Sequence, residues 1–269
     1  MALAQYDGRG AQSPGRSVAQ SGQSQTAKED QRDRRHFRQH RKKDRAAVPA
    51  DTIKRLSIDC TATVLIGDVS RGGRTRGDNQ ACDHDLGLHE KYIPCGIVDE
   101  ESGQLHITFG SAYKTSDFIV ETLEAWWAAL DETEQGAMTR LQIKMDNGPE
   151  SSGRRTQFLH RMVALCDAIG KPIQLLYYPP YHSKYNPIER CWGILELHWN
   201  GTKLVHVETM VEWAKSRTWK GMHPIVALSR QVYQKGVTLS TKAMRAVEAR
   251  LERHPELPKW DILIHPSST

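Results

Sequence analysis

The stretch KYIPCGIVDEESGQLHITFG, residues 91–110, contains two apolar runs separated by the polar turn residues DEESG. Two such runs around a Gly-containing turn predict a β-hairpin. The run before it, LSIDCTATVLIG (56–67), alternates apolar and polar residues and is rich in β-branched side chains, which predicts another strand. We therefore expect the ordered chain to begin near Thr52 with three antiparallel strands.

Helices and strands alternate after this hairpin. Residues 116–130, 153–170 and 187–199 have helical apolar spacing, and two or three more helical patterns follow to about residue 253. The short apolar runs LQIKMD (141–146) and IQLLYY (173–178) are typical of strands. This order predicts an α/β fold with helices on both faces of a mixed sheet. Three antiparallel strands followed by helix–strand–helix–strand–helix is the ribonuclease H-like order, so we expect a five-stranded sheet of that class, plus a C-terminal helical extension.

Residues 1–50 differ in composition from the rest of the chain. They carry 11 Lys or Arg and 5 Asp or Glu, a net charge of 11 − 5 = +6, whereas the 269-residue chain carries 37 and 32, a net charge of +5. Residues 51–269 therefore hold 26 and 27, a net charge of −1, so charge alone does not indicate that the folded part binds nucleic acid. Because the first 50 residues have few aliphatic side chains, we expect a disordered basic head at 1–50. Its run HFRQHRKKDR (36–45) either contacts phosphate or is a solvated tail.

The remaining chain divides into a ribonuclease H-like domain at 51–200 and its helical extension at 201–269. Five widely spaced cysteines with no CxxC pair give no sign of a zinc site and are typical of a reduced, cytoplasmic protein. No apolar run approaches the roughly 18–20 residues that cross a bilayer, and the N-terminus lacks the apolar centre of a secretory signal. We therefore expect no membrane partner.

Three acidic residues lie at positions that suggest chemistry. Asp59 lies within the first strand, Asp146 ends the fourth, and Glu189 lies in the first turn of the helix after the fifth. In the expected topology the first and fourth strands are neighbours and that helix packs across their ends, so the three carboxylates can converge. Unit charges about 4 Å apart repel by roughly 4 kcal/mol at an effective dielectric near 20. Two Mg²⁺ or Mn²⁺ ions would remove this repulsion and activate a water or a 3′-hydroxyl at a phosphodiester.

Each acid also has a purely structural interpretation. Asp59 could face solvent, although Asp is depleted in strands, and Asp146-Asn147-Gly148 could be only a turn. Glu189 falls at the third helical position after Asn186 and Pro187, where it could close a capping box. Apolar residues at helical spacing would bury the opposite stripe of this helix: Ile188, Trp192, Leu195 and Trp199.

Three motifs occur in order: SIDCTATVLIGDVSRGG (57–73), IKMDNGPESSGRRTQF (143–158) and PPYHSKYNPIERCWGILE (179–196). Over residues 51–264 the chain resembles DDE transposases of bacterial insertion sequences, above all the Rhodopirellula-type transposase DDE domain, and its last motif resembles a signature of mariner-type elements. The resemblance implies that Asp59, Asp146 and Glu189 are the catalytic, metal-binding triad. It implies positioning roles for four further residues: Asn147, His182, Ser183 and Asn186.

The spacing from the second to the third acid, 189 − 146 = 43 positions, is longer than is usual in mariner-type elements. It is compatible with a longer connection between strand and helix. We expect basic residues near the acids to contact the DNA backbone, and the alternative is that these basic side chains are only solvated. They are Arg71, Arg74, Arg76, Arg154, Arg155 and Lys184.

The resemblance implies nicking at transposon ends and strand transfer into target DNA. The expected partners are double-stranded DNA, both the transposon ends and the target, and a second copy of the chain in a homo-oligomer. The expected location is the cytoplasm, on the nucleoid when DNA is bound. Residues 1–50 show no helix-turn-helix pattern, so we expect an N-terminally truncated element whose head comes from an altered reading frame. Two alternatives stay open: a stand-alone nuclease of the same fold, and an inactive remnant that binds DNA or inhibits the full-length transposase.

Overall fold

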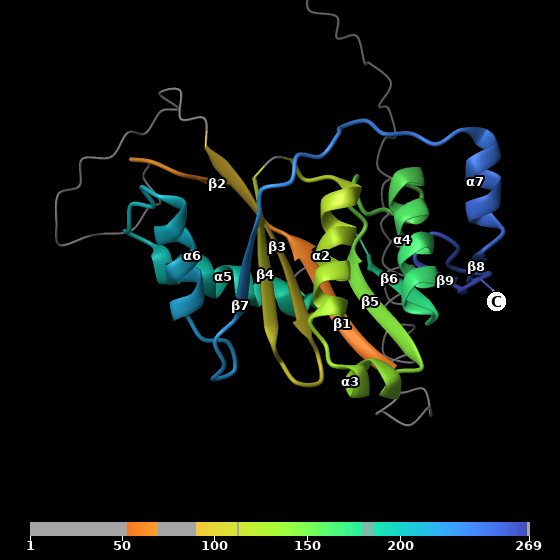
Figure 1. Ribbon diagram of the computed structural model, residues 1–269, viewed down its shortest axis with the longest axis horizontal. Coiled ribbons are helices and arrows are strands. Elements are labelled where there is room, and N and C mark those ends of the chain that lie inside the picture. The colour runs from red at the N-terminus through yellow and green to blue at the C-terminus, as the bar shows by residue number, and fades with distance from the viewer. Residues whose placement is uncertain (1–52, 69–89, 112, 180–181, 183–184, 268–269) are drawn as a thin grey trace, which may run out of the picture.

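The computed structural model describes residues 53–68, 90–111, 113–179, 182 and 185–267. The basic head and the whole polar stretch 70–87 lie outside these ranges, so the prediction of a disordered head stays a prediction. Figure 1 shows the described chain as one mixed sheet with helices on both faces. The helices of the described ranges include none that is both long enough and apolar enough to span a membrane.

The five central strands have the expected order and directions. β1 (Ile53–Cys60) pairs antiparallel with β3 (Lys91–Asp99), which pairs antiparallel with β4 (Leu105–Gly110). On its other side β1 pairs parallel with β5 (Arg140–Asp146), which pairs parallel with β6 (Ile173–Tyr178). The order β4-β3-β1-β5-β6 confirms the ribonuclease H-like fold.

The sheet is wider than expected, because the C-terminal region adds strands at both edges. β7 (Ile225–Ser229) pairs parallel with β4, and β9 (Asp261–Ile264) pairs antiparallel with β6 and with β8 (Leu251–Arg253). The prediction that the C-terminal extension is helical is therefore wrong in part. Residues 201–267 combine α6 (Val207–Ser216) and α7 (Thr241–Glu248) with three strands. The reason is that free β4 and β6 edges expose unpaired backbone groups, which these short strands satisfy.

The first predicted strand, 56–67, is also interrupted. β1 ends at Cys60, and a separate short strand, β2 (Val64–Leu65), pairs with β3.

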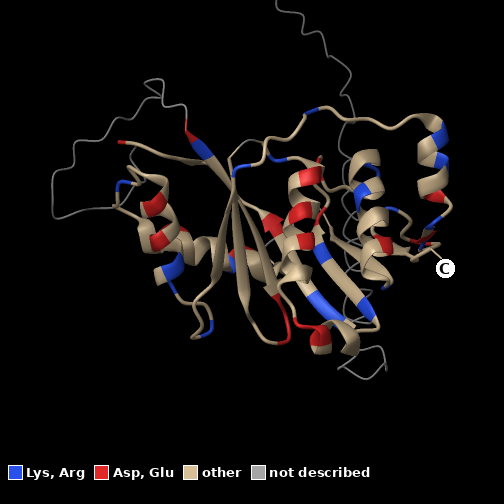
Figure 2. Cartoon of the chain, in the orientation of Figure 1, with Lys and Arg blue, Asp and Glu red and all other residues tan. Residues whose placement is uncertain are grey.

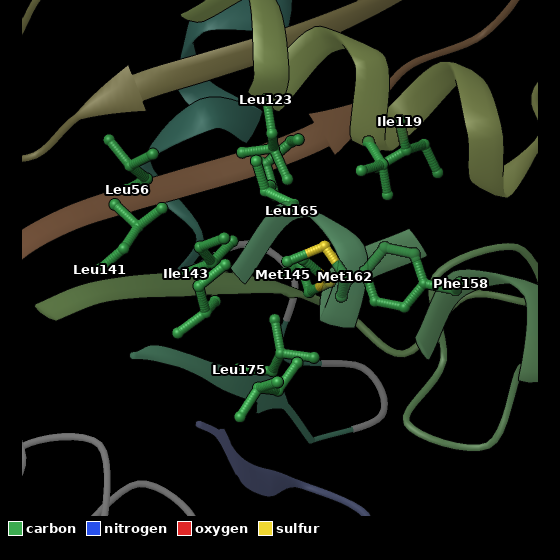
Figure 3. Packing of buried hydrophobic residues seen from close by; sticks show 14 of the residues in the cluster. Leu56, Ile119, Leu123, Leu141, Ile143, Met145, Phe158, Met162, Leu165 and Leu175 are labelled. Atoms are coloured by element: carbon green, nitrogen blue, oxygen red, sulfur yellow. The ribbon is translucent and has the colours of Figure 1, made fainter. Parts of the chain in front are cut away.

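Two apolar layers hold the helices on the sheet. α2 (Ser116–Ala128), α4 (Thr156–Ile169) and α7 share one buried cluster with β1, β5, β6 and β9, part of which Figure 3 shows. α5 (Pro187–Trp199) and α6 share the other with β3 and β4. A short helix, α3 (Glu132–Ala137), leads into β5. Helices thus cover both faces, as expected.

Local signals explain where these helices begin and end. Thr115 caps α2 by accepting a hydrogen bond from the Phe118 backbone N–H. Gly170 ends α4 in the left-handed conformation, with φ of 64°, which glycine adopts without steric cost. α5 begins at Pro187, whose missing N–H costs nothing in the first turn.

Candidate active site

Asp59 lies one residue before the end of β1, on the side of the strand that faces α5. Alternation along the strand sends Leu56 and Ile58 into the core below α2, so Asp59 points the other way. The indole Nε1 of Trp192, on α5, donates a hydrogen bond of 3.2 Å to Asp59 Oδ2. A residue of the helix that carries Glu189 therefore orients the carboxylate of Asp59.

A glycine permits this close approach of helix and strand. Gly96 on β3 is the cross-strand partner of Asp59, and a Cβ added at Gly96 would lie 2.7 Å from side-chain carbons of both Ile188 and Trp192. Such a distance is far inside van der Waals contact, so a larger residue would push α5 off the sheet. Helix α5 accordingly packs on β1 and β3, not across the ends of β1 and β5 as the sequence suggested.

The start of α5 is held by a buried amide. Asn186 is fully buried, and its Nδ2 donates a hydrogen bond of 3.4 Å to the backbone carbonyl of Ile58, next to Asp59. The side chain of Asn186 makes no capping hydrogen bond, so the capping-box interpretation of Glu189 is wrong. Within the described residues the half-buried Glu189 carboxylate forms no hydrogen bond or ion pair, which leaves it available to the site.

Asp146 lies at the carboxyl end of β5. Since β1 and β5 are parallel neighbours, their carboxyl ends share one edge, and Asp59 and Asp146 line the same small cavity with Lys114. The Oδ1 atom of Asp146 is buried and has no hydrogen-bond partner among the described residues. An acceptor buried without a partner is costly and needs a function or a ligand to account for it.

Burial raises the pKa values of all three acids, and neighbouring acids add to the shifts of Asp59 and Glu189. Burial, and then the charges of Glu189 and Asp146, raise the pKa of Asp59 to about 6. Burial also raises the pKa of Asp146 and, together with the charge of Asp146, that of Glu189. Lys114 acts against all three shifts. Within the described part of the chain, the carboxylates therefore share one electrostatic environment, in which Lys114 is the counter-charge.

The donor set suits a hard divalent cation. In the described ranges, no three His, Cys, Asp or Glu side chains already form a cluster that could hold a metal ion. The unpartnered Oδ1 of Asp146 and the mutual repulsion of the acids nonetheless fit such an ion, which prefers carboxylate oxygens and lowers the pKa values that burial raises.

The other predicted residues have varied surroundings. The exposed Asn147 accepts a hydrogen bond of 3.4 Å from the Gly153 backbone N–H and so braces the loop after β5. The ring of His182 stacks on that of Tyr185, with centroids 5.9 Å apart. Arg154 is exposed, and Arg155 forms an ion pair of 3.4 Å with Glu150 just before α4. Five predicted residues lie outside the described ranges: Arg71, Arg74, Arg76, Ser183 and Lys184.

Three residues of the site were missed by sequence reasoning. Lys114, whose Nζ donates a hydrogen bond of 3.3 Å to the Cys60 carbonyl, belongs to no motif and merely precedes the cap of α2. Trp192 was assigned only to the buried stripe, which is confirmed, but its indole N–H reaches Asp59. Gly96 gives no signal in the sequence, because its importance comes from a helix that packs against it from 90 residues away.

The chain matches one family of known proteins. The family described as "Rhodopirellula transposase DDE domain" matches residues 14–266, so the match begins within the basic head. No curated protein matches the chain.

The chain is also similar to several solved structures. The Mos1 transposase paired-end complex with left transposon end aligns with a TM-score of 0.48 and 12% identity, over 79% of this chain and 58% of the Mos1 chain. The Mos1 mariner paired-end complex with Mn aligns with a TM-score of 0.44 and 12% identity, over the same shares. The HTLV-2 integrase catalytic core domain in complex with magnesium aligns with a TM-score of 0.37 and 14% identity, over 65% of this chain and 94% of that domain. The chain thus spans 58% of the length of the Mos1 transposase that it matches.

Proposed function

This chain belongs to the Rhodopirellula transposase DDE domain family, and from that premise we propose that it is a transposase catalytic domain that cleaves DNA at transposon ends and transfers the freed strand into target DNA. Asp59, Asp146 and Glu189 are the proposed catalytic residues. The observation that carries this assignment is the cavity that Asp59 and Asp146 share, where Oδ1 of Asp146 is buried with no partner among the described residues. The charge of Glu189 is close enough to raise the pKa of Asp59.

The proposed cofactor is a pair of Mg²⁺ or Mn²⁺ ions held by these three carboxylates. When bound, they would supply activation of an oxygen nucleophile and stabilisation of the leaving oxygen. The residues around the acids prepare this site. Trp192 orients the carboxylate of Asp59, the amide of Asn186 ties the start of α5 to β1, and Lys114 offsets part of the acidic charge.

The proposed reaction has two balanced steps. In the first, water attacks the phosphorus at the transposon end, the bond from phosphorus to the 3′-oxygen breaks, and that oxygen takes up a proton to become a free 3′-hydroxyl. In the second, the 3′-hydroxyl attacks a target phosphodiester and the target's own 3′-oxygen leaves. One phosphodiester bond forms and one breaks, so strand transfer requires no external energy source.

Nicking and joining can be measured with the full 269-residue chain. We expect the wild type in Mg²⁺ or Mn²⁺ to nick a labelled DNA fragment from the flanks of its reading frame and to join it to a target plasmid. Asp146→Asn should reduce nicking by about 100-fold or more, as the loss of a group that stabilises transition-state charge does. Asp68→Asn, the same substitution at an exposed residue after β2, serves as the control.

The possible outcomes separate the candidates. Nicking without joining would indicate a stand-alone nuclease, and equal background activity of wild type and Asp146→Asn would indicate an inactive remnant. Either result would contradict the proposed transposase activity. Double-stranded DNA as the partner, and self-association on it, belong to the same proposal.

A further inference from the structure

A second cavity lies beside the small cavity of Asp59 and Asp146, and Lys114 lines both. Its volume of about 470 Å³ falls in the range of about 300–1,000 Å³ that is usual for ligand pockets. Its walls come from the segment that enters α2, the segment that enters α4, and residues 234–237 between β7 and α7. Figure 1 shows this last segment passing the N-terminal end of α2.

The cavity has an excess of positive charge. Its three cations are Lys114, Arg155 and Lys235, and its two acids, Asp117 and Glu150, already have partners. Glu150 pairs with Arg155, and Asp117 pairs with Arg161 at 3.3 Å and accepts from Gln157 at 3.0 Å. In contrast, neither Lys114 nor Lys235 forms an ion pair with any residue that the structure describes.

An exposed aromatic ring holds Lys235 at the rim of this cavity. The Nζ atom of Lys235 lies 3.3 Å from the ring centroid of Tyr113, whose side chain is exposed, and Nζ of Lys91 lies 5.9 Å from the same centroid. Contact with the negative face of an aromatic ring stabilises an ammonium group. Figure 2 shows basic positions along the segment between β7 and α7. The neighbour of the Lys235 ammonium group among the described residues is thus an aromatic ring.

Lys114, Arg155 and Lys235 line a cavity next to the acids, and a DNA strand carries one negative charge on each phosphate. Lysine and arginine contact phosphates whatever the base sequence, and such contacts set the position of the strand. Cations beside an acidic site attract the phosphate backbone and so favour a strand held close to the acids.

We propose that this second cavity is a phosphate-binding subsite for the DNA strand that leads into the acid site, with Lys235 at its rim and Lys114 at its junction with the acids. Tyr113 is a positioning residue that acts through Lys235. The proposal deepens the proposed function and rests on it, since it takes DNA as the substrate. It assigns to the subsite the backbone phosphate next to the one that reacts.

The salt dependence of DNA binding tests this subsite. We suggest measuring the fluorescence anisotropy of a labelled 20-base-pair duplex, and of one of its strands, with the full chain in Ca²⁺ at a series of NaCl concentrations. Loss of one phosphate contact should reduce the slope of log K against log[NaCl] by about 0.9 for the duplex or about 0.7 for the single strand. Lys235→Ala should produce this reduction and weaken binding at low salt, and Lys235→Arg should restore the slope.

Lys242→Ala is the matched control, because Lys242 is an exposed lysine only seven positions away, on α7, outside the cavity. It should leave the slope unchanged. Tyr113→Leu alone should weaken DNA binding, but combined with Lys235→Ala it should weaken binding no further than Lys235→Ala does alone. The inference is overturned if Lys235→Ala and Lys242→Ala have the same slope, or if the wild type binds neither probe.

The nicking assay separates this inference from the proposed reaction. If the wild type does not nick DNA but Lys235→Ala still reduces the slope, the reaction is wrong and the subsite stands. If the wild type nicks and joins DNA while Lys235→Ala has the slope of the control, the reaction stands and the subsite is wrong.

Discussion

Two groups of three carboxylates lie toward opposite ends of β1, and they differ in their partners. At the hairpin turn between β3 and β4, every acid has a cation: Asp99 pairs with Lys54, Glu100 with Lys144 at 2.8 Å, and Glu101 with Arg55 at 3.1 Å. Ser57 and Ser102 add hydrogen bonds to Glu100 and Asp99. This cluster satisfies its own charges, so its role is structural.

Among the residues that the structure describes, the second group, at the carboxyl end of β1, has Lys114 as the counter-charge for three acids. Its buried charges are under-compensated, as the buried Oδ1 of Asp146 and the raised pKa of Asp59 show. The number of acids therefore does not distinguish a candidate active site from a structural cluster. The supply of counter-charges does, because an uncompensated buried carboxylate costs stability and persists where function requires it.

Substitution of Glu189 should have the largest effect. We expect Glu189→Gln to reduce nicking by about 100-fold or more, because it removes a charged oxygen donor while preserving the shape of the side chain. Glu196→Gln, the same change two turns along α5, should retain wild-type nicking. Gel assays with equal amounts of folded protein measure both, and equal loss in the two variants would remove Glu189 from the site.

The pH dependence of stability should distinguish the two clusters next. The folded-state pKa of Asp59 is raised from 3.8 to about 6, so protonation favours the folded state. The stability that this group contributes is fully present below pH 4 and is lost as the pH rises through 6. At about 1.4 kcal/mol for each unit of pKa shift, the loss is at most about 3 kcal/mol. Asp59→Asn should abolish this loss.

Urea unfolding at pH 4 and pH 7, without divalent ions, measures the effect. The pKa of Asp99 shifts in the opposite direction. Burial alone would raise this pKa, but the hydrogen bonds from Lys54 and Ser102 lower it. Its contribution is therefore present above its unfolded pKa and is lost as the pH falls. Equal pH profiles for Asp59→Asn and the wild type would contradict the assigned environment of Asp59.

A methyl group at Gly96 should disturb only the under-compensated cluster. Gly96→Ala forces Ile188 and Trp192 away from β3, and overpacking of this kind costs about 1–3 kcal/mol. Because the shift moves Trp192 and Glu189 relative to Asp59, nicking should fall more than the loss of folded protein explains. Gly193→Ala, on the open face of α5, is the control. A Gly96→Ala variant with full nicking activity would show that the close packing of α5 is not required.

Glu100→Gln should have the smallest effect and should change stability alone. It weakens the contacts of Glu100 with Lys144 and Ser57, and the weakening of hydrogen bonds that involve charged groups costs about 1–3 kcal/mol. Thermal unfolding should show the loss, whereas nicking per folded molecule should not change. If the fully folded variant nicked DNA more slowly than the wild type, the hairpin cluster would also contribute to the reaction.

Short-range patterns were enough to predict most of the fold. The helix over Pro187–Trp199 and the strand over Ile173–Tyr178 have the expected bounds, because apolar spacing, Pro and Gly act locally. The wider sheet was not predictable, since β7 and β9 are short and pair with strands more than 80 residues away. Their sequences carry too few residues to separate strand from helix by periodicity.

The same division holds for the candidate site. The amino-acid sequence by itself determined which carboxylates stand out, since an acid within a strand, one at a strand end and one in a proline-framed helical turn are local features of the chain. Only the tertiary structure decided which neighbours they have: Gly96 admits α5, Trp192 reaches Asp59, and Lys114 enters from the segment before α2. Electrostatic compensation depends on distance in space, and chain spacing does not encode that distance.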